Sequence, residues 1–270
     1  MAGRKPTLSP TRIRAYLECA MKYRYIYVDK IGRFYLRAHA GYSFGSTLHH
    51  VLQQFHDQGA GETAEAMVSR IDQNWIAVGY ETVEQQQEHR EAGVRMIQEY
   101  HSAHRQRIAD EIETLAVEKT ISCDMGRFKL SGRVDRIDRH SDGRLEVIDY
   151  KSGRTETSSD EVLDSLAMSC YQLILRKMYP GVPVFATIYS LRTGHQASAE
   201  LTGERLGEFE RDILVLGAEI LDRDYSGVEP VPVPACKECD FLPRCEAFWR
   251  QQEREALWGN MDSPHSEHGL

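Results

Sequence analysis

The sequence predicts an α/β fold in which a mixed β-sheet is flanked by helices. Short β-rich runs separated by glycine-containing turns lie between residues 113 and 150, and one more such run lies at 184–191. Amphipathic helical patterns precede these runs, separate the third from the fourth and follow the last. The resulting order is helices, three strands, helix, strand, helix, which favours one sheet covered by helices.

Helical patterns dominate the first 108 residues. Ser9 is an N-cap residue followed by Pro10 at the first helical position, and apolar residues then recur at helical spacing, which predicts a helix over about 10–28. A second apolar stripe from Phe44 to Phe55 predicts a helix that carries His49. Residues 61–108 are rich in Glu, Gln, Arg and Ala, which suits two helices exposed on one side.

The strand-like runs are short and separated by turns. TLAVEKTIS, RFKLSGRVDRID and RLEVIDY predict three antiparallel strands, with turns at 124–126 and 141–143. Residues 160–179 predict a helix, VFATIYSL a fourth strand, and 203–224 another amphipathic helix.

The distribution of apolar residues indicates where in the cell the protein is expected to lie. The 270 residues include no run of about 18 apolar residues, and the first ten, MAGRKPTLSP, lack the apolar stretch of a secretory signal. We therefore expect a cytoplasmic protein with no membrane association.

The net charge of −8 conceals an asymmetry. Residues 1–40 carry nine Lys and Arg against two acidic residues, a charge of +7, whereas the remaining 230 residues carry −15. A basic segment suits nucleic-acid binding. Its aromatic residues either stack on unpaired bases or form the inner face of an amphipathic helix; they are Tyr16, Tyr23, Tyr25, Tyr27, Phe34 and Tyr35.

Two carboxylates and a lysine are expected to converge on the sheet. Asp149 and Lys151 are two residues apart in a predicted strand, so their side chains share a face. If Arg139 pairs with Leu145, Asp135 falls opposite Asp149; a register slip of one residue would turn it to the other face. Paired carboxylates repel each other unless a cation lies between them, and Mg²⁺ or Mn²⁺ suits such ligands.

This constellation fits phosphodiester hydrolysis. Asp135 and Asp149 would hold a metal whose bound water is the nucleophile, and Lys151 would orient that water or stabilise charge on the phosphate. The alternative is an exposed ion pair on a hairpin.

Three of the six cysteines are clustered. Cys236, Cys239 and Cys245 have C-x2-C-x5-C spacing, and Cys19 lies far upstream. Zinc sites commonly use two C-x2-C pairs, whereas iron–sulfur clusters often take irregular spacing and a remote ligand, which fits better. Cys123 and Cys170 are expected to be buried free thiols.

The motifs resemble a known family. The runs 132–138 (GRVDRID) and 147–153 (VIDYKSG) are similar to the paired motifs of the PD-(D/E)XK nuclease superfamily, in its RecB-like exonuclease branch. GSTLH at 45–49 resembles the histidine motif of that branch, and Tyr171-Gln172 begins its glutamine motif, although Arg176 stands where a tyrosine is usual. The chain is also similar to CRISPR-adaptation exonucleases and to the AddB nuclease domain.

The resemblance implies a restriction-endonuclease-like core and further site residues. His49 joins Asp135 and Asp149 as a metal ligand, with the Tyr150 carbonyl completing the site and His50 as the competing ligand. Gln172 helps to position the substrate or Lys151. The iron–sulfur members of the branch imply a 4Fe–4S cluster, with zinc or unligated thiols as alternatives, held by Cys19, Cys236, Cys239 and Cys245.

We therefore expect a DNA exonuclease that prefers single strands and acts in repair, recombination or defence. The alternatives are a non-catalytic nucleic-acid-binding module and a nuclease subunit active only within a helicase or CRISPR-adaptation complex. The expected organisation is one domain over residues 1–255 and a flexible tail at 256–270. Within the domain lie a helical elaboration at about 43–110, a catalytic core at about 113–225, and a cysteine segment at 236–245 joined to Cys19.

Overall fold

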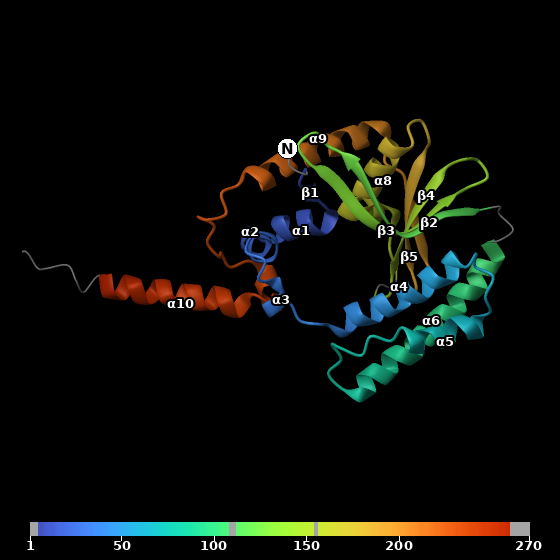
Figure 1. Cartoon of the computed structure of the whole chain (residues 1–270), viewed down its shortest axis with the longest axis horizontal. Coiled ribbons are helices and arrows are strands. Elements are labelled where there is room, and N and C mark those ends of the chain that lie inside the picture. The colour runs from blue at the N-terminus through green and yellow to red at the C-terminus, as the bar shows by residue number, and fades with distance from the viewer. Residues whose placement is uncertain (1–4, 108–111, 154–155, 260–270) are drawn as a thin grey trace, which may run out of the picture. The chain divides into compact units, whose positions relative to one another are not determined.

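The computed structural model describes residues 5–107, 112–153 and 156–259 (Figure 1). The chain divides into two compact units, one formed by the start of the chain and residues 38–222, the other by residues 14–37 and those from 223 onward. The single domain expected over 1–255 stays a prediction. The last helix runs to Gly259, and the rest of the expected tail lies outside the described residues.

The first unit is built on a six-stranded mixed sheet. The strands are β1 (Thr7–Leu8), β2 (Glu113–Asp124), β3 (Lys129–Arg139), β4 (Leu145–Lys151), β5 (Val184–Ser190) and β6 (Gln196–Ala199). Their order is β1-β3-β4-β5-β6, with β2 paired to β3. Strands β2, β3 and β4 are antiparallel, β4 and β5 are parallel, and β5 and β6 are antiparallel. The α/β fold with a mixed sheet is confirmed.

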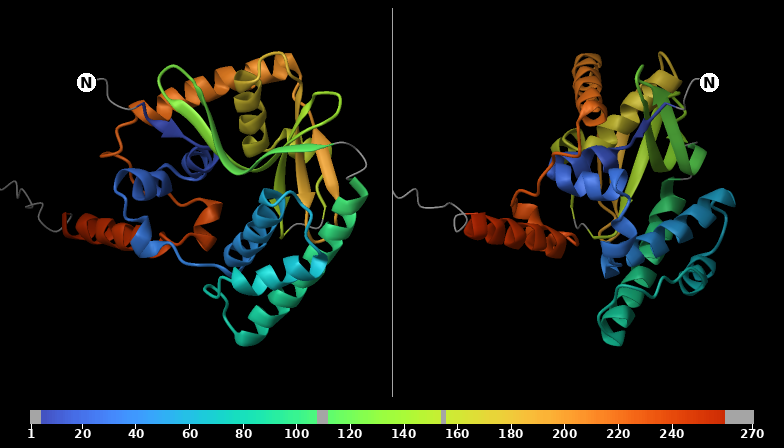
Figure 2. Two further views of the ribbon diagram at one scale, coloured as in Figure 1. Left: turned by 45° about the vertical axis from the view of Figure 1, so that its right-hand side comes forward. Right: turned by 60° about the vertical axis from the view of Figure 1, so that its left-hand side comes forward.

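A layer of three helices lies against one face of the sheet, and the second of these helices packs on the other two rather than on the strands (Figures 1 and 2). They are α4 (Ala40–Asp57), α5 (Ala64–Gln73) and α6 (Val83–Arg107), close to the predicted bounds. The apolar stripe of α4, which includes Leu48 and Phe55, packs with α5 and α6 into a core that also contains Ile148 and Tyr150 of β4. Because β4 is buried on both faces, almost every one of its residues is inaccessible to solvent.

The helical segment expected over residues 160–179 is two helices rather than one. α7 (Ser159–Leu163) ends shortly before Ser165, whose hydroxyl accepts from the Met168 amide and caps α8 (Leu166–Met178). An N-cap serine starts a new helix, which is why the pattern is interrupted. α9 (Gly203–Asp222) packs closely on the residue that precedes β3, since a Cβ at Gly217 would lie 2.3 Å from the Phe128 ring.

The second unit contains short helices and the cysteine segment. The helix expected over about 10–28 is broken into α1 (Pro10–Glu18), which begins in the first unit, α2 (Ala20–Tyr23) and the π-helix η1 (Arg24–Val28). Cys19 caps α2, since its Sγ accepts from the Lys22 amide at 3.4 Å. The remaining elements, none of them predicted, are α3 (Gly32–Tyr35), the 3-10 helix η3 (Pro234–Glu238) and α10 (Leu242–Gly259).

Several aromatic residues of the basic segment face inward. Tyr16, Tyr23 and Tyr25 are buried, so for these three the amphipathic alternative holds and base stacking does not. Phe34 is 68% exposed. None of the described helices is both long and apolar enough to cross a membrane.

Candidate active site

The pairing of β3 with β4 brings the two predicted aspartates together. Arg139 pairs with Leu145 and Arg136 with Ile148, which is the register that the sequence required for Asp135 to face Asp149. The Tyr150 amide donates to Asp135 Oδ2 at 2.7 Å, so Asp135 is tied to the backbone of β4 between Asp149 and Lys151.

Asp149 and Lys151 form an ion pair on this face. Lys151 Nζ lies 2.6 Å from Asp149 Oδ2, and the side chains are 44% and 11% exposed. Burial raises the pKa of Asp149, and the neighbouring charge of Asp135 adds to that rise, whereas Lys151 opposes it. The lysine therefore projects from a buried acidic site toward solvent, where a substrate can reach it.

His49 reaches the acids from α4. Leu48 and Val51, on the apolar stripe of α4, are buried. His49 lies at the border of that stripe and faces β4. His49 Nε2 lies 3.1 Å from the Tyr150 carbonyl oxygen, and Nδ1 lies 3.3 Å from Asp135 Oδ1. His50 is exposed and does not belong to the group of converging ligand atoms found among the described residues.

Glu118 of β2 belongs to the same group, and the sequence analysis did not single it out. Its Oε1 lies 3.3 Å from His49 Nδ1, and the ligand atoms of His49, Glu118 and Asp135 all lie within 4.8 Å of one another. Its Oε2 accepts from Arg133 Nε at 2.6 Å. Extending the antiparallel pairing from the turn at 124–126 would have placed Glu118 opposite Asp135. This pairing was the only feature of the sequence that pointed to Glu118 as a site residue.

These contacts set the charge of the metal-free site. Burial alone would lower the pKa of His49, but hydrogen bonds and charge from Asp135 and Glu118 outweigh it and raise the pKa to about 10. Burial would raise the pKa of Glu118, yet its bonds to His49 and Arg133 lower it. At neutral pH an imidazolium thus occupies a position between carboxylates. A divalent cation can take the place of the positive charge on His49. Carboxylate and imidazole groups are suitable ligands for a cation of the Mg²⁺ or Mn²⁺ type.

A cleft opens above these residues. Tyr42, from the first turn of α4, is 77% exposed and lines it. Arg133 and Lys151 contribute positive charge, and His50 also faces the cleft. A cleft that joins carboxylates to cationic side chains and an exposed aromatic ring can bind an anionic polymer with planar groups.

Gln172 and Tyr171 lie on α8. Gln172 is buried, its Oε1 accepts from the Leu201 amide at 2.9 Å, and its Nε2 has no hydrogen-bond partner among the described residues. The positioning role of Gln172 stays a prediction. Tyr171 donates to the Arg133 carbonyl at 2.8 Å, and its ring lies so close to Gly132 that a Cβ there would be 2.3 Å away. Because there is no room for a Cβ beside the Tyr171 ring, the first residue of GRVDRID has to be glycine.

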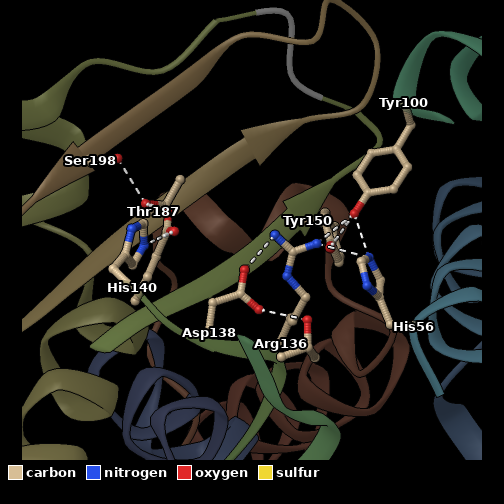
Figure 3. Close-up of polar contacts among 10 residues, drawn as sticks. His56, Tyr100, Arg136, Asp138, His140, Tyr150, Thr187 and Ser198 are labelled. Carbon is tan, nitrogen blue, oxygen red and sulfur yellow. Dashed lines mark hydrogen bonds and ion pairs between the residues drawn. The ribbon is translucent and has the colours of Figure 1, made fainter. Parts of the chain in front are cut away.

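A buried polar network supports β4 from its other face (Figure 3). Arg136 Nη1 donates to Tyr100 Oη at 2.7 Å and to His56 Nε2 at 2.8 Å, and Arg136 pairs with Asp138 at 2.9 Å. Tyr100 is bonded in turn to the hydroxyl of Tyr150 at 2.8 Å. Burial, together with the charge of Arg136, lowers the pKa of His56 to about 2, which keeps its ring neutral. The network thereby fixes the residue between Asp149 and Lys151.

The four predicted cluster cysteines lie together in the second unit. Cys19, Cys236, Cys239 and Cys245 line one pocket, and all are free thiols. The Val233 amide donates to Cys236 Sγ at 3.4 Å. Burial, with the neighbouring thiols, raises the pKa of Cys245 to about 11. A pocket lined by four cysteines offers soft sulfur ligands of the kind that bind metal ions. Cys123 and Cys170 are buried in the first unit, as expected.

Comparison with known proteins gives an independent result. The family description "PD-(D/E)XK nuclease superfamily" matches residues 7–246. One of the subunits of the ATP-dependent helicase/deoxyribonuclease of Lactococcus lactis is 30% identical over 90 residues, which are 30% of this chain and only 8% of that protein. A candidate exonuclease of known structure from Eubacterium rectale is 13% identical with a TM-score of 0.55, covering 89% of this chain and 87% of its own, and this likeness concerns the fold.

Proposed function

The chain belongs to the PD-(D/E)XK nuclease superfamily, and from that premise we propose that it cleaves DNA with Mg²⁺ or Mn²⁺ at the site of Asp135, Asp149 and Lys151. His49, Asp135, Asp149 and the Tyr150 carbonyl would hold the metal. The observation that carries the proposal is the convergence of His49 with Asp135 next to the Asp149–Lys151 pair. The metal, when bound, supplies an activated water and a positive field for the phosphate.

The protein side chains would divide the remaining work. Lys151 is partly exposed and forms an ion pair with Asp149, so its ammonium is placed to orient the attacking water or to stabilise negative charge on the phosphate oxygens. The Tyr150 amide fixes the Asp135 carboxylate, and the Tyr100 bond fixes Tyr150. Gln172 would position the substrate or Lys151. Held in this way, the reacting groups need little reorganisation in the transition state.

We propose further that the enzyme is an exonuclease that prefers single-stranded DNA and acts in repair, recombination or defence. The RecB-like form of its motifs supports an exonuclease, and the exposed Tyr42 ring in the cleft supports a substrate with unpaired bases. The relative from Lactococcus lactis is part of a helicase/deoxyribonuclease, which favours a helicase as partner. A non-catalytic binding module is less well supported, since both aspartates and the lysine of the motif are present.

The cysteine pocket is proposed to hold a 4Fe–4S cluster with a structural role. The remote Cys19 and the irregular spacing of the other three cysteines support iron and sulfide over zinc. The free thiols and the absence of disulfides among the described residues suit a reducing compartment, so we propose a cytoplasmic location.

Cleavage of end-labelled DNA tests both levels of the proposal. Cleavage of linear single strands should stop in EDTA and return with Mn²⁺ or Mg²⁺, and no activity with any divalent ion would refute the nuclease. An exonuclease needs a free end, so a closed single-stranded circle of the same sequence should survive. Equal rates on circle and line would replace the exonuclease with an endonuclease and leave the metal chemistry standing.

A further inference from the structure

Glu118 occupies an unusual place for a carboxylate in the middle of a strand. Val117 pairs with Arg136 and Lys119 with Val134, so Glu118 lies opposite Asp135. Its side chain is only 9% exposed, close to the 11% of Asp135. Two carboxylates buried side by side repel each other, and a cation between them relieves that repulsion.

The donor atoms around Glu118 converge. Glu118 Oε1 and Asp135 Oδ1 each lie 3.3 Å from His49 Nδ1, which places an imidazole between the two carboxylates. A mixed set of carboxylate and imidazole donors is more than an acidic cluster, because the imidazole is a ligand for Mn²⁺ and similar ions. Replacement of the imidazole proton by a divalent ion would leave all three side chains directed at one point.

The backbone and a neighbouring arginine hold Glu118 in this position. Glu118 has a φ of +45°, in the left-handed region that favours glycine. Any residue with a side chain adopts this backbone conformation at a cost in free energy. Arg133 Nε, at 2.6 Å, holds the second oxygen and leaves Oε1 to face His49. Arg133 is two residues from Asp135 on β3, so both project from the same face.

We infer that Glu118 is itself a ligand of the divalent cation, together with His49 and Asp135, and that Arg133 is its positioning residue. The inference rests on the proposed function, because it adds a ligand to the metal site described there. The rival role is that of an acceptor that only orients the His49 ring.

Manganese binding in the absence of DNA tests the ligand. In isothermal titration calorimetry of the 270-residue chain with Mn²⁺, Glu118→Gln should weaken binding at least about tenfold. Glu113→Gln is the matched control, since Glu113 lies on the same strand and pairs with Arg139 at 3.2 Å but is 64% exposed. It should bind Mn²⁺ like the wild type. Wild-type affinity in Glu118→Gln would overturn the inference.

A second variant, Glu118→Gly, tests the inference even if Glu118→Gln does not fold. Glu118→Gly removes the carboxylate and suits the positive φ, so its thermal midpoint without metal should equal or exceed that of the wild type, while Mn²⁺ affinity falls as in Glu118→Gln. Undiminished Mn²⁺ affinity in the folded glycine variant would overturn the inference even if Glu118→Gln did not fold.

Direct ligation is distinguished from orientation of His49 by pulsed electron–nuclear double resonance. Protein labelled with ¹³C at glutamate carboxyl groups and loaded with Mn²⁺ should show a ¹³C coupling that Glu118→Gly lacks. Weaker binding without that coupling would establish the orienting role and overturn ligation. If the wild type binds no Mn²⁺, or Asp135→Asn binds as the wild type does, the proposed metal site itself fails, an outcome distinct from the failure of Glu118 alone.

Discussion

Lys151 Nζ lies 2.6 Å from Asp149 Oδ2, with the carboxylate buried and the ammonium partly open to solvent. The two side chains share one face of β4 because they are two residues apart, and the strand is held in place by a parallel neighbour, β5, along its whole length. The lysine ammonium is therefore held at a fixed position next to the proposed metal site.

Replacing Lys151 with methionine should lower kcat at least about 100-fold, because the variant loses the charge that stabilises the transition state. Binding of single-stranded DNA in Ca²⁺ should change much less, since a single ammonium contributes only a small part of it. Lys119→Met, an exposed lysine of β2, is the control and should cleave normally. A Lys151→Met enzyme with wild-type kcat would remove Lys151 from the mechanism.

The period of two along a strand was sufficient to predict that Asp149 and Lys151 share a face. The register that brings Asp135 to them was predicted only on the condition that Arg139 pairs with Leu145, and the structure has that pairing. Glu118 was missed although simple extension of the β2–β3 pairing places it opposite Asp135, because it belongs to none of the motifs that marked the other site residues. The positive φ at Glu118 is a feature that strand alternation does not anticipate.

The short elements were missed for a different reason. β1 and β6 have two and four residues, and their pairing with β3 and β5 depends on tertiary contacts rather than on a local pattern. The break at Cys19 was hidden by apolar residues that continue at helical spacing across it. The position of His49 relative to the sheet came from the family resemblance, because no local pattern sets the packing of α4 on β4.

His56 should lower the stability of the protein in mild acid, whereas His49, whose pKa is raised to about 10, should oppose that loss in the metal-free protein. The pKa of His56 is lowered to about 2 in the fold, against 6.5 for the ordinary group, so below pH 6.5 the unfolded chain binds a proton that the folded protein does not. This contribution is fully present above about pH 6.5 and is lost as the pH falls from there toward 2. Between pH 7.5 and 5.5 it should amount to about 1.4 kcal/mol of the free energy of unfolding.

Urea unfolding of the metal-free wild type and of His56→Gln at the two pH values isolates the contribution of His56. His56→Gln cannot titrate at this position, so from pH 7.5 to 5.5 its free energy of unfolding relative to that of the wild type should rise by about 1.4 kcal/mol. His50→Gln, an exposed neighbour on α4, should behave as the wild type does. An identical pH dependence in wild type and His56→Gln would show that His56 is not held neutral.

The cysteine pocket should contain iron and sulfide after anaerobic purification. The protein should be brown, with broad absorbance near about 400 nm from thiolate-ligated iron. Cys239→Ser should lower both iron content and the thermal midpoint, yet the folded fraction should keep its cleavage rate because the proposed role is structural. Cys123→Ser, from the first unit, is the control and should retain its iron. A colourless protein with stoichiometric zinc would refute the cluster.

Tyr42 should supply the preference for unpaired bases. Its ring is 77% exposed at the start of α4 and lines the cleft that contains Lys151, and an exposed aromatic ring on a rigid helix is a surface on which a base can stack. A base in a duplex already stacks on its neighbours and gains nothing from this ring, so the benefit falls on single strands. Tyr42→Ala should therefore weaken single-strand binding by about 1–3 kcal/mol and leave duplex binding nearly unchanged.

The measurement is fluorescence anisotropy with labelled single- and double-stranded oligonucleotides in Ca²⁺ at fixed salt. Tyr42→Phe keeps the ring and loses the hydroxyl, so it should bind single strands as the wild type does if stacking is the cause. If Tyr42→Phe instead matches Tyr42→Ala, the hydroxyl would account for the affinity. If Tyr42→Ala weakens both forms of DNA equally, Tyr42 contributes general contact area, and the preference for single strands must arise elsewhere in the cleft.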